Sequence, residues 1–188
     1  MLLSLDPSTR TGYALCEPFT GRPVIRCGSW HAPKGEDTYR SRFLGRELIR
    51  LLKEEQITRA AIEIPMAVPP APRKVQKVTA LGFETVMETQ GSVQTQNLLN
   101  GIHHVLCFTL AMYRIPFHRV GVKEWRKHTL GNGNIPGAES KKRCKSLLES
   151  MGVYVANQDE AEAGGILLWL NGHERRFREE DALRARAA

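Results

Sequence analysis

Four acidic residues that lie far apart in the sequence are candidates for chemistry: Asp6, Glu63, Asp159 and Glu162. Asp6 ends the apolar run LLSLD and Glu63 lies within the apolar run AAIEIPM, so both are expected in buried strands. A buried carboxylate needs a cationic partner, because the loss of hydration is costly. A salt bridge to an arginine such as Arg10, or a turn cap by Asp6, would satisfy either residue without a catalytic role.

Asp159 and Glu162 belong to the segment DEAE, and their spacing puts them on one face of a helix. Acidic residues at a helix start also favour the helix dipole, so the pair alone predicts only a helix N-terminus. The small residues Ala161 and 163–165 would let the first turns pack closely against a sheet. The two carboxylates would then point inward.

One explanation covers all four residues. Four carboxylates at one point would repel one another unless divalent cations neutralised them, and ligands that are all oxygen suit Mg²⁺ or Mn²⁺ rather than zinc. Two such ions about 4 Å apart are the arrangement used for in-line attack on a phosphodiester. The sequence therefore predicts a nuclease with two Mg²⁺ ions per active site, for which Mn²⁺ can substitute.

The elements that must position these residues are predicted from hydrophobic periodicity. The first half of the chain predicts three strands, a helix and a fourth strand, at residues 2–6, 11–17, 24–31, 38–56 and 60–66. Three strands before any helix predict an antiparallel meander, and the helical crossover predicts that the fourth strand pairs parallel to the first. Thr38 is the expected N-cap of the helix.

The second half of the chain begins with the least regular segment, 67–93, where PPAP cannot be helical and the length of the connection is typical of a functional or a mobile segment. A helix at 96–113, a strand at 117–122, a basic glycine-rich connection at 122–142, a helix at 141–152 ended by Gly152, a short edge strand at 153–156 and a last helix from about Asp159 follow. We expect an α/β nuclease domain at 1–172 and a charged tail or helix extension at 173–188.

The chain is basic, with a net charge of +7 and a pI near 9.5, which favours a polyanionic partner such as nucleic acid. Alone, the basic run near 141–145 would be read as the solvated face of an amphipathic helix, but a phosphate backbone requires positive charge beside an acidic metal site. The residues expected to bind DNA are Arg73, Lys74, Lys77, Lys123, Lys127, Lys141, Lys142 and Arg143.

The location of the protein in the cell is predicted from the sequence features that membrane and secreted proteins usually carry. No apolar run approaches the roughly 18 residues of a membrane span, and no basic leader precedes the first apolar run, so we expect a cytoplasmic protein without a membrane partner. The four cysteines show no Cys-x-x-Cys pair and are expected as reduced thiols. Trp30, Trp125 and Trp169 are expected in the core or in interfaces, with Trp125 the one candidate for stacking on DNA.

The segments LSLDPSTRTGYAL, AIEIPM, WRKHTLG…ESKKR and DEAEA together resemble the RuvC family of Holliday junction resolvases, in order and spacing, from residue 1 to about 172. The resemblance implies a ribonuclease H-like mixed sheet flanked by helices, a homodimer, and paired nicks across a four-way junction. It places Asp6, Glu63, Asp159 and Glu162 at the metal-ligand positions. Lys127 and Lys141 would face the scissile phosphate and its neighbours, and the helix at 96–113 would supply much of the dimer interface.

The sequence departs from the family pattern at three places. Glu162 stands where the family typically has Asp, and Ser8 stands where it usually has Gly. The segment 66–93 is longer than the family's, and Phe83 is its only aromatic residue. These departures look like the phage-borne or prophage-borne branch, which tends towards broader cleavage of branched DNA.

Two other functions are open at this point. An actin-like ATPase also carries an acidic loop after its first strand, and Gly164 and Gly165 would be its adenosine-contacting glycines, but that fold needs two such domains. A non-catalytic branched-DNA-binding protein of the same fold is the other alternative. Such a protein would usually have lost one or more of the four carboxylates.

Overall fold

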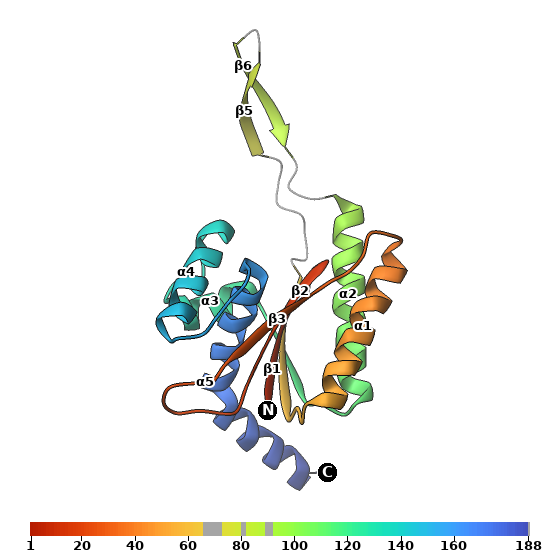
Figure 1. Ribbon diagram of the computed structural model, residues 1–188, viewed down its shortest axis with the longest axis vertical. Coiled ribbons are helices and arrows are strands. Elements are labelled where there is room, and N and C mark those ends of the chain that lie inside the picture. The colour runs from red at the N-terminus through yellow and green to blue at the C-terminus, as the bar shows by residue number, and fades with distance from the viewer. Residues whose placement is uncertain (66–72, 80–81, 89–91, 188) are drawn as a thin grey trace.

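A mixed five-stranded sheet separates two layers of helices (Figure 1). The structure is a computed structural model and describes residues 1–65, 73–79, 82–88 and 92–187. Its elements, in chain order, are β1 (Leu2–Asp6), β2 (Arg10–Cys16), β3 (Arg26–His31), α1 (Asp37–Glu54), β4 (Arg59–Glu63), β5 (Arg73–Thr79), β6 (Gly82–Glu88), α2 (Val93–Met112), β7 (Phe117–Val120), α3 (Val122–Leu130), α4 (Gly137–Ser150) and α5 (Gln158–Ala187).

The sheet has the strand order β3-β2-β1-β4-β7. The first three strands pair antiparallel, and β4 pairs parallel to both β1 and β7. The predicted meander, the parallel fourth strand and the α/β fold class are therefore confirmed. The β1–β4 register pairs Leu5 with Ile62, so that Asp6 and Glu63 are the next residues of two adjacent strands.

The alternation of side chains along β1 and β4 decides which layer each residue faces. Leu3, Leu5 and Ile62 belong to the core between the sheet and the layer of α1 and α2. Leu2 and Ala61 belong to the opposite core, which packs against the layer of α3, α4 and α5. Continuing this alternation by one residue directs Asp6 and Glu63 towards the layer that contains α5.

A two-stranded hairpin, β5–β6, extends away from the body of the molecule (Figure 1), and we call it the arm. Its strands pair antiparallel from Arg73 opposite Glu88 to Thr79 opposite Gly82. The arm follows β4 and precedes α2 in the chain. The expectation of an irregular segment at 67–93 was therefore wrong for these two strands, and residues 66–72, 80–81 and 89–91 lie outside the described part.

Three other local predictions were wrong. Residues 122–130 form α3 rather than a connection, and residues 153–156 are not a strand. The N-cap of α1 is Glu36 rather than Thr38, and it makes no side-chain cap hydrogen bond. The end of α4 agrees with expectation, because Gly152 follows it with a positive φ of 79°.

The last helix, α5, continues well past the first 172 residues and remains packed on the body. Its distal part buries Glu174 and Phe177, while Arg175, Arg176 and Arg178 form i,i+4 ion pairs at its surface. No described helix is both long enough and apolar enough to span a membrane.

Candidate active site

Asp6 and Glu63 lie side by side at the carboxyl ends of β1 and β4, facing α5. Asp6 is buried, and the turn that follows it is closed by hydrogen bonds between Ser8 and Thr11. Asp6 is therefore not the cap of this turn. The position of both carboxylates follows from the parallel pairing of their strands.

Asp159 and Glu162 lie in the first turn and a half of α5. The cap of this helix is Asn157, whose side-chain oxygen accepts hydrogen bonds from the backbone N–H groups of Asp159 and Glu160 at 3.1 and 3.0 Å. The Asp159 carboxylate is thus left for other contacts. A β-carbon at Gly12 would lie 2.1 Å from the Asp159 carbonyl oxygen, so a glycine in β2 lets α5 approach the sheet this closely.

The other glutamate of the DEAE segment, Glu160, faces away from these residues. Its carboxylate accepts hydrogen bonds from the Ser29 hydroxyl, the Asn157 amide and the Ala156 backbone N–H. Glu160 therefore ties the start of α5 to β3. Only Asp159 and Glu162 project from this segment towards Asp6.

The four carboxylates form one electrostatic cluster. Burial raises the pKa of Asp6 well above its ordinary value, and the charges of Glu63, Glu162 and Asp159 raise it further. Burial is also the main cause that raises the pKa of Glu63 to about 7, with a contribution from the charge of Glu162. The charge of Glu162 thus acts on Asp6 although 156 positions separate the two residues in the chain.

Two cations partly neutralise the cluster. The Lys141 ammonium lies 3.1 Å from Asp159 Oδ1 and 3.4 Å from Glu162 Oε2. The Arg126 guanidinium lies 2.9 Å from Glu162 Oε1 and also donates to the Ile135 carbonyl. The nearby carboxylates raise the pKa of Lys141 against the opposing effect of its burial.

The carboxylate oxygens suit a hard cation such as Mg²⁺ or Mn²⁺. Glu63, Asp159 and Glu162 turn oxygens towards N–H and ammonium donors, and no described group of three or more His, Cys, Asp or Glu side chains stands at metal-binding spacing. The donor set is all oxygen, and Asp6 and Glu63 carry raised pKa values that a nearby positive charge would lower. The residues therefore fit a magnesium site in the chemistry of their donor atoms.

Comparison with known proteins identifies the fold. No family model and no curated protein sequence matches the chain. Among solved structures, Thermus thermophilus RuvC superposes with a TM-score of 0.61 at 13% identity, covering 93% of this chain and 95% of that one. The same protein in complex with a Holliday junction substrate gives a TM-score of 0.63 at 12% identity and the same coverage. The chain has the RuvC fold.

A second RuvC-like neighbour is the yeast mitochondrial Holliday junction resolvase, with a TM-score of 0.51 at 11% identity over 95% of this chain and 85% of that one. The RuvC fold argues against the ATPase alternative. The neighbours match nearly the whole chain as one fold, whereas an actin-like ATPase needs two such domains. Gly164 and Gly165 lie inside α5, where they pack against Leu148 and Trp125. Glycines buried in a helix do not form a nucleotide-binding loop.

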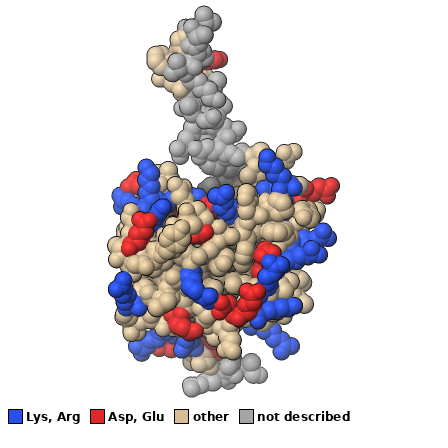
Figure 2. All heavy atoms as spheres, viewed as in Figure 1, with Lys and Arg blue, Asp and Glu red and all other residues tan. Residues whose placement is uncertain are grey.

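The residues predicted to bind DNA have different environments within the RuvC fold. Lys141 lies in the carboxylate cluster, whereas Lys123, Lys127 and Lys142 are exposed on α3 and α4. Arg143 is exposed and pairs with Glu139. Arg73, Lys74 and Lys77 are residues of β5, in the arm. Figure 2 shows lysine and arginine side chains on both sides of the end of the body from which the arm leaves.

Two residues that contact the carboxylate cluster were not predicted as its partners from the sequence, and both belong to α3. Arg126, rather than its exposed neighbour Lys127, contacts Glu162. Trp125 is completely buried, which confirms the expected core position and excludes it as the candidate for stacking on DNA, and its indole N–H donates to Glu63. The signal that could have found them is helical spacing from Val122, which puts Trp125 one turn into a helix that directly follows β7.

Proposed function

We propose that this chain is a structure-selective endonuclease that nicks four-way DNA junctions and other branched DNA by two-metal phosphodiester hydrolysis. The observation that carries this proposal is the cluster that Asp6 and Glu63, at the carboxyl ends of two parallel strands, form with Asp159 and Glu162 of α5 in a RuvC fold. A solved RuvC structure contains a Holliday junction substrate, which supports branched DNA as the ligand class. All four positions carry an acidic residue, which favours an enzyme over a non-catalytic binding protein.

In this proposal the four carboxylates hold two Mg²⁺ ions, which when bound would activate water and stabilise the leaving 3′ oxygen. Lys141 supplies a positive charge that balances Asp159 and Glu162 before metal binds. If Asp159 and Glu162 bound a metal instead, the Lys141 ammonium would be available to a non-bridging oxygen of the scissile phosphate. Arg126 holds Glu162 from the side of α3 and so fixes the longer side chain that replaces the family's usual aspartate.

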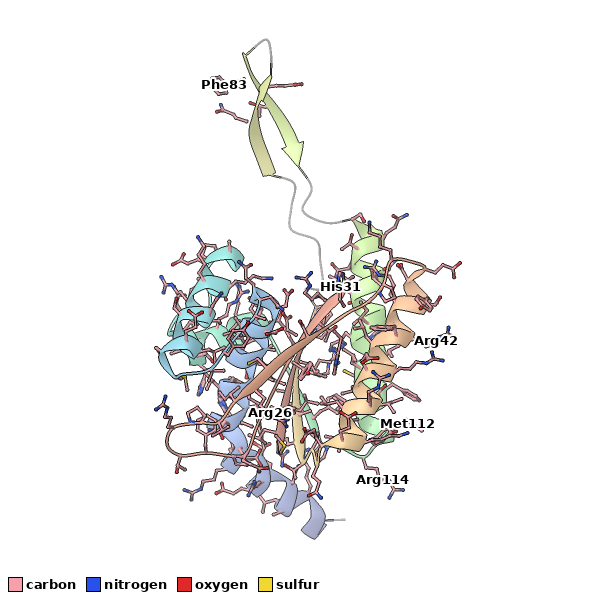
Figure 3. The ribbon with its side chains drawn as sticks, viewed as in Figure 1. Arg26, His31, Arg42, Phe83, Met112 and Arg114 are labelled. Carbon is pink, nitrogen blue, oxygen red and sulfur yellow. The ribbon has the colours of Figure 1, made fainter. Side chains whose placement is uncertain are left out.

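The arm and the exposed lysines are proposed to hold the branched DNA. Phe83 points outward near the tip of the arm (Figure 3) and is 77% exposed. An exposed aromatic ring on a projecting hairpin is suited to stacking on an unpaired base at a branch point. Lys123, Lys127 and Lys142 would contact phosphates of the arms of the junction beside the cluster.

A second copy of the chain is the proposed protein partner. Phe108 and Met112 are 67% and 66% exposed and are one helical turn apart on α2. Met112 projects from the outer side of the α1–α2 layer (Figure 3). Two copies joined through α2 would place two active sites for paired nicks on one junction.

The proposal is tested by incubating the protein with Mg²⁺ and labelled four-way junctions, forks, flaps and linear duplex. We expect nicks in the branched substrates and none in the linear duplex. Asp6→Asn should bind a junction without cutting it, while Glu149→Gln, a carboxylate on the exposed face of α4, should cut like the wild type. Failure of the wild type to cut any branched substrate would leave the binding-protein alternative, and cutting by Asp6→Asn would refute the site.

A further inference from the structure

The hydrogen bond between Trp125 and Glu63 follows from the topology of the sheet. Glu63, the last residue of β4, pairs with Val120, the last residue of β7. The chain leaves β7 and begins α3 at Val122, which brings Trp125 over the end of β4. The indole Nε1–H donates to Glu63 Oε2 at 2.5 Å.

The indole ring is held in place on all sides. Trp125 has an exposed fraction of 0% and lies in the core between the sheet and α5. A β-carbon on Gly165 would lie 2.9 Å from the ring, so α5 has room for the indole only because this position is glycine. The Thr129 hydroxyl donates to the Gly165 carbonyl at 2.9 Å and fixes α3 on α5 one turn further along.

The bond is specific to one oxygen of the carboxylate. Oε2 of Glu63 accepts from the indole, and no described residue donates a hydrogen bond to Oε1. A carboxylate held through one oxygen keeps a fixed rotamer and presents the other oxygen in a fixed direction. Groups that orient a metal ligand in this way commonly change metal affinity when they are removed.

Burial alone does not require this bond. Trp169 occupies the same core and is also buried, but its indole N–H has no hydrogen-bond partner among the described residues. The core therefore accepts an indole whose N–H is unpaired. The orientation of Trp125 towards Glu63 is a separate property of the site.

We propose that Trp125 is a positioning residue for Glu63: its indole N–H holds Oε2 and directs Oε1 to a divalent cation. This inference rests on the proposed function, because it assumes that Glu63 is a metal ligand. It assigns α3 a role in arranging the metal site, in addition to any contact with DNA.

The test compares Trp125→Phe with the matched variant Trp169→Phe, each of which removes an indole from the same core. Binding of Mn²⁺ to the DNA-free protein is measured by calorimetry. We expect Trp125→Phe to weaken Mn²⁺ binding by about 10- to 100-fold, whereas Trp169→Phe should bind Mn²⁺ like the wild type. Equal affinities for Trp125→Phe and the wild type would overturn the inference.

A double-mutant cycle with Glu63→Gln separates positioning from a general loss of packing. If Trp125 acts through Glu63, Trp125→Phe should cause no further loss of Mn²⁺ affinity in the Glu63→Gln background. Independent losses that multiply would contradict the inference. Because these readouts need no cleavage, a wild type that binds Mn²⁺ in this manner but cuts no junction would refute the nuclease proposal and leave the positioning role intact.

A second measurement uses the wild-type side chain and so does not depend on the folding of Trp125→Phe. In a ¹⁵N–¹H spectrum, the indole resonance of Trp125 should lie downfield because its N–H donates to a carboxylate. It should move when Mg²⁺ is added and shift upfield in Glu63→Gln, with the Trp169 resonance as the internal reference. A Trp125 resonance that responds to neither change would refute the inference.

Discussion

Glu63 binds a proton more tightly in the folded chain than in the unfolded one, because burial and the charge of Glu162 raise its pKa from 4.5 to about 7. The unfolded chain therefore releases this proton at lower pH than the folded protein. The favourable contribution of the protonated group to stability is fully present below the unfolded pKa and is lost as the pH rises through the folded value. Asp6 behaves in the same direction.

The prediction at this scale concerns the metal-free protein. Between about pH 5 and about pH 8, the wild type should lose stability relative to Glu63→Gln, whose amide does not titrate. Thermal unfolding in the presence of a chelator measures this difference. Added Mg²⁺ should raise the melting temperature of the wild type more at the upper end of this range, because protons there no longer compete with Mg²⁺ for the Glu63 carboxylate. Parallel pH curves for the two proteins would refute the raised pKa.

The residues of the cluster that could be predicted best from the sequence are the charged ones that stand within apolar runs. Asp6 and Glu63 stand in apolar runs, so their burial was evident from sequence, and the structure confirms it for Asp6. Asp159 and Glu162 looked like an ordinary helix start, but the cap of this helix is Asn157, and the two carboxylates instead contact Lys141. Arg126 and Trp125 were not foreseen as contacts of the cluster, because their segment was read as a connection.

At the scale of elements, α5 is anchored to the sheet at its distal end through β4. The Arg59 guanidinium lies 2.9 Å from Glu174 and 2.6 Å from Asp181. Phe177 stacks on His118 of β7 with ring centroids 3.5 Å apart. We call these five residues the distal clamp. It makes residues beyond 172 part of the packed fold.

Truncation of Phe177 tests the distal clamp. Phe177→Ala should lower the free energy of unfolding by about 3–5 kcal/mol, the usual range for a buried phenylalanine. Leu183→Ala, on the same helix but 64% exposed, should change it by less than about 0.5 kcal/mol. Urea denaturation of the metal-free proteins provides both values. Similar effects of the two substitutions would show that the clamp does not stabilise the fold.

The elements that the sequence predicted well are those with a regular apolar period. The strands β1, β2 and β4 were predicted correctly because burial on both faces produces nearly continuous apolar runs, and the parallel pairing of β4 with β1 is confirmed. The helix α3 was missed because basic residues and the following glycines obscure a helix that buries only Trp125. The arm was missed because its strands form a sheet of their own, apart from the main one.

At the scale of the whole molecule, the exposed apolar residues of α2 predict association. Met112→Glu should convert the protein from a dimer to a monomer, because it places a charge in the proposed interface. Analytical ultracentrifugation measures the change. Leu183→Glu is the control, since Leu183 is equally exposed but lies on α5. A wild-type protein that is monomeric at all concentrations would refute the α2 interface.

Removal of the arm should weaken recognition of branched DNA without destabilising the fold. Replacement of residues 66–91 by a short Gly/Ser linker should leave the melting temperature close to that of the wild type, because β5 and β6 pair with each other rather than with the main sheet. Mn²⁺ binding should persist, while affinity for four-way junctions over linear duplex should fall. Gel-shift titrations at a fixed salt concentration measure the ratio of the two affinities. An unchanged ratio would exclude the arm from junction recognition.

The continuous helix α5 also limits how this protein can change in evolution. It carries Asp159 and Glu162 near its start, and Glu174 and Asp181 of the distal clamp further along. Insertion or deletion of one residue between these two groups would rotate one of them by about 100° relative to the other. The number of residues between 163 and 173 is therefore fixed, whereas the arm can lengthen or shorten by whole pairs of residues without altering the active site.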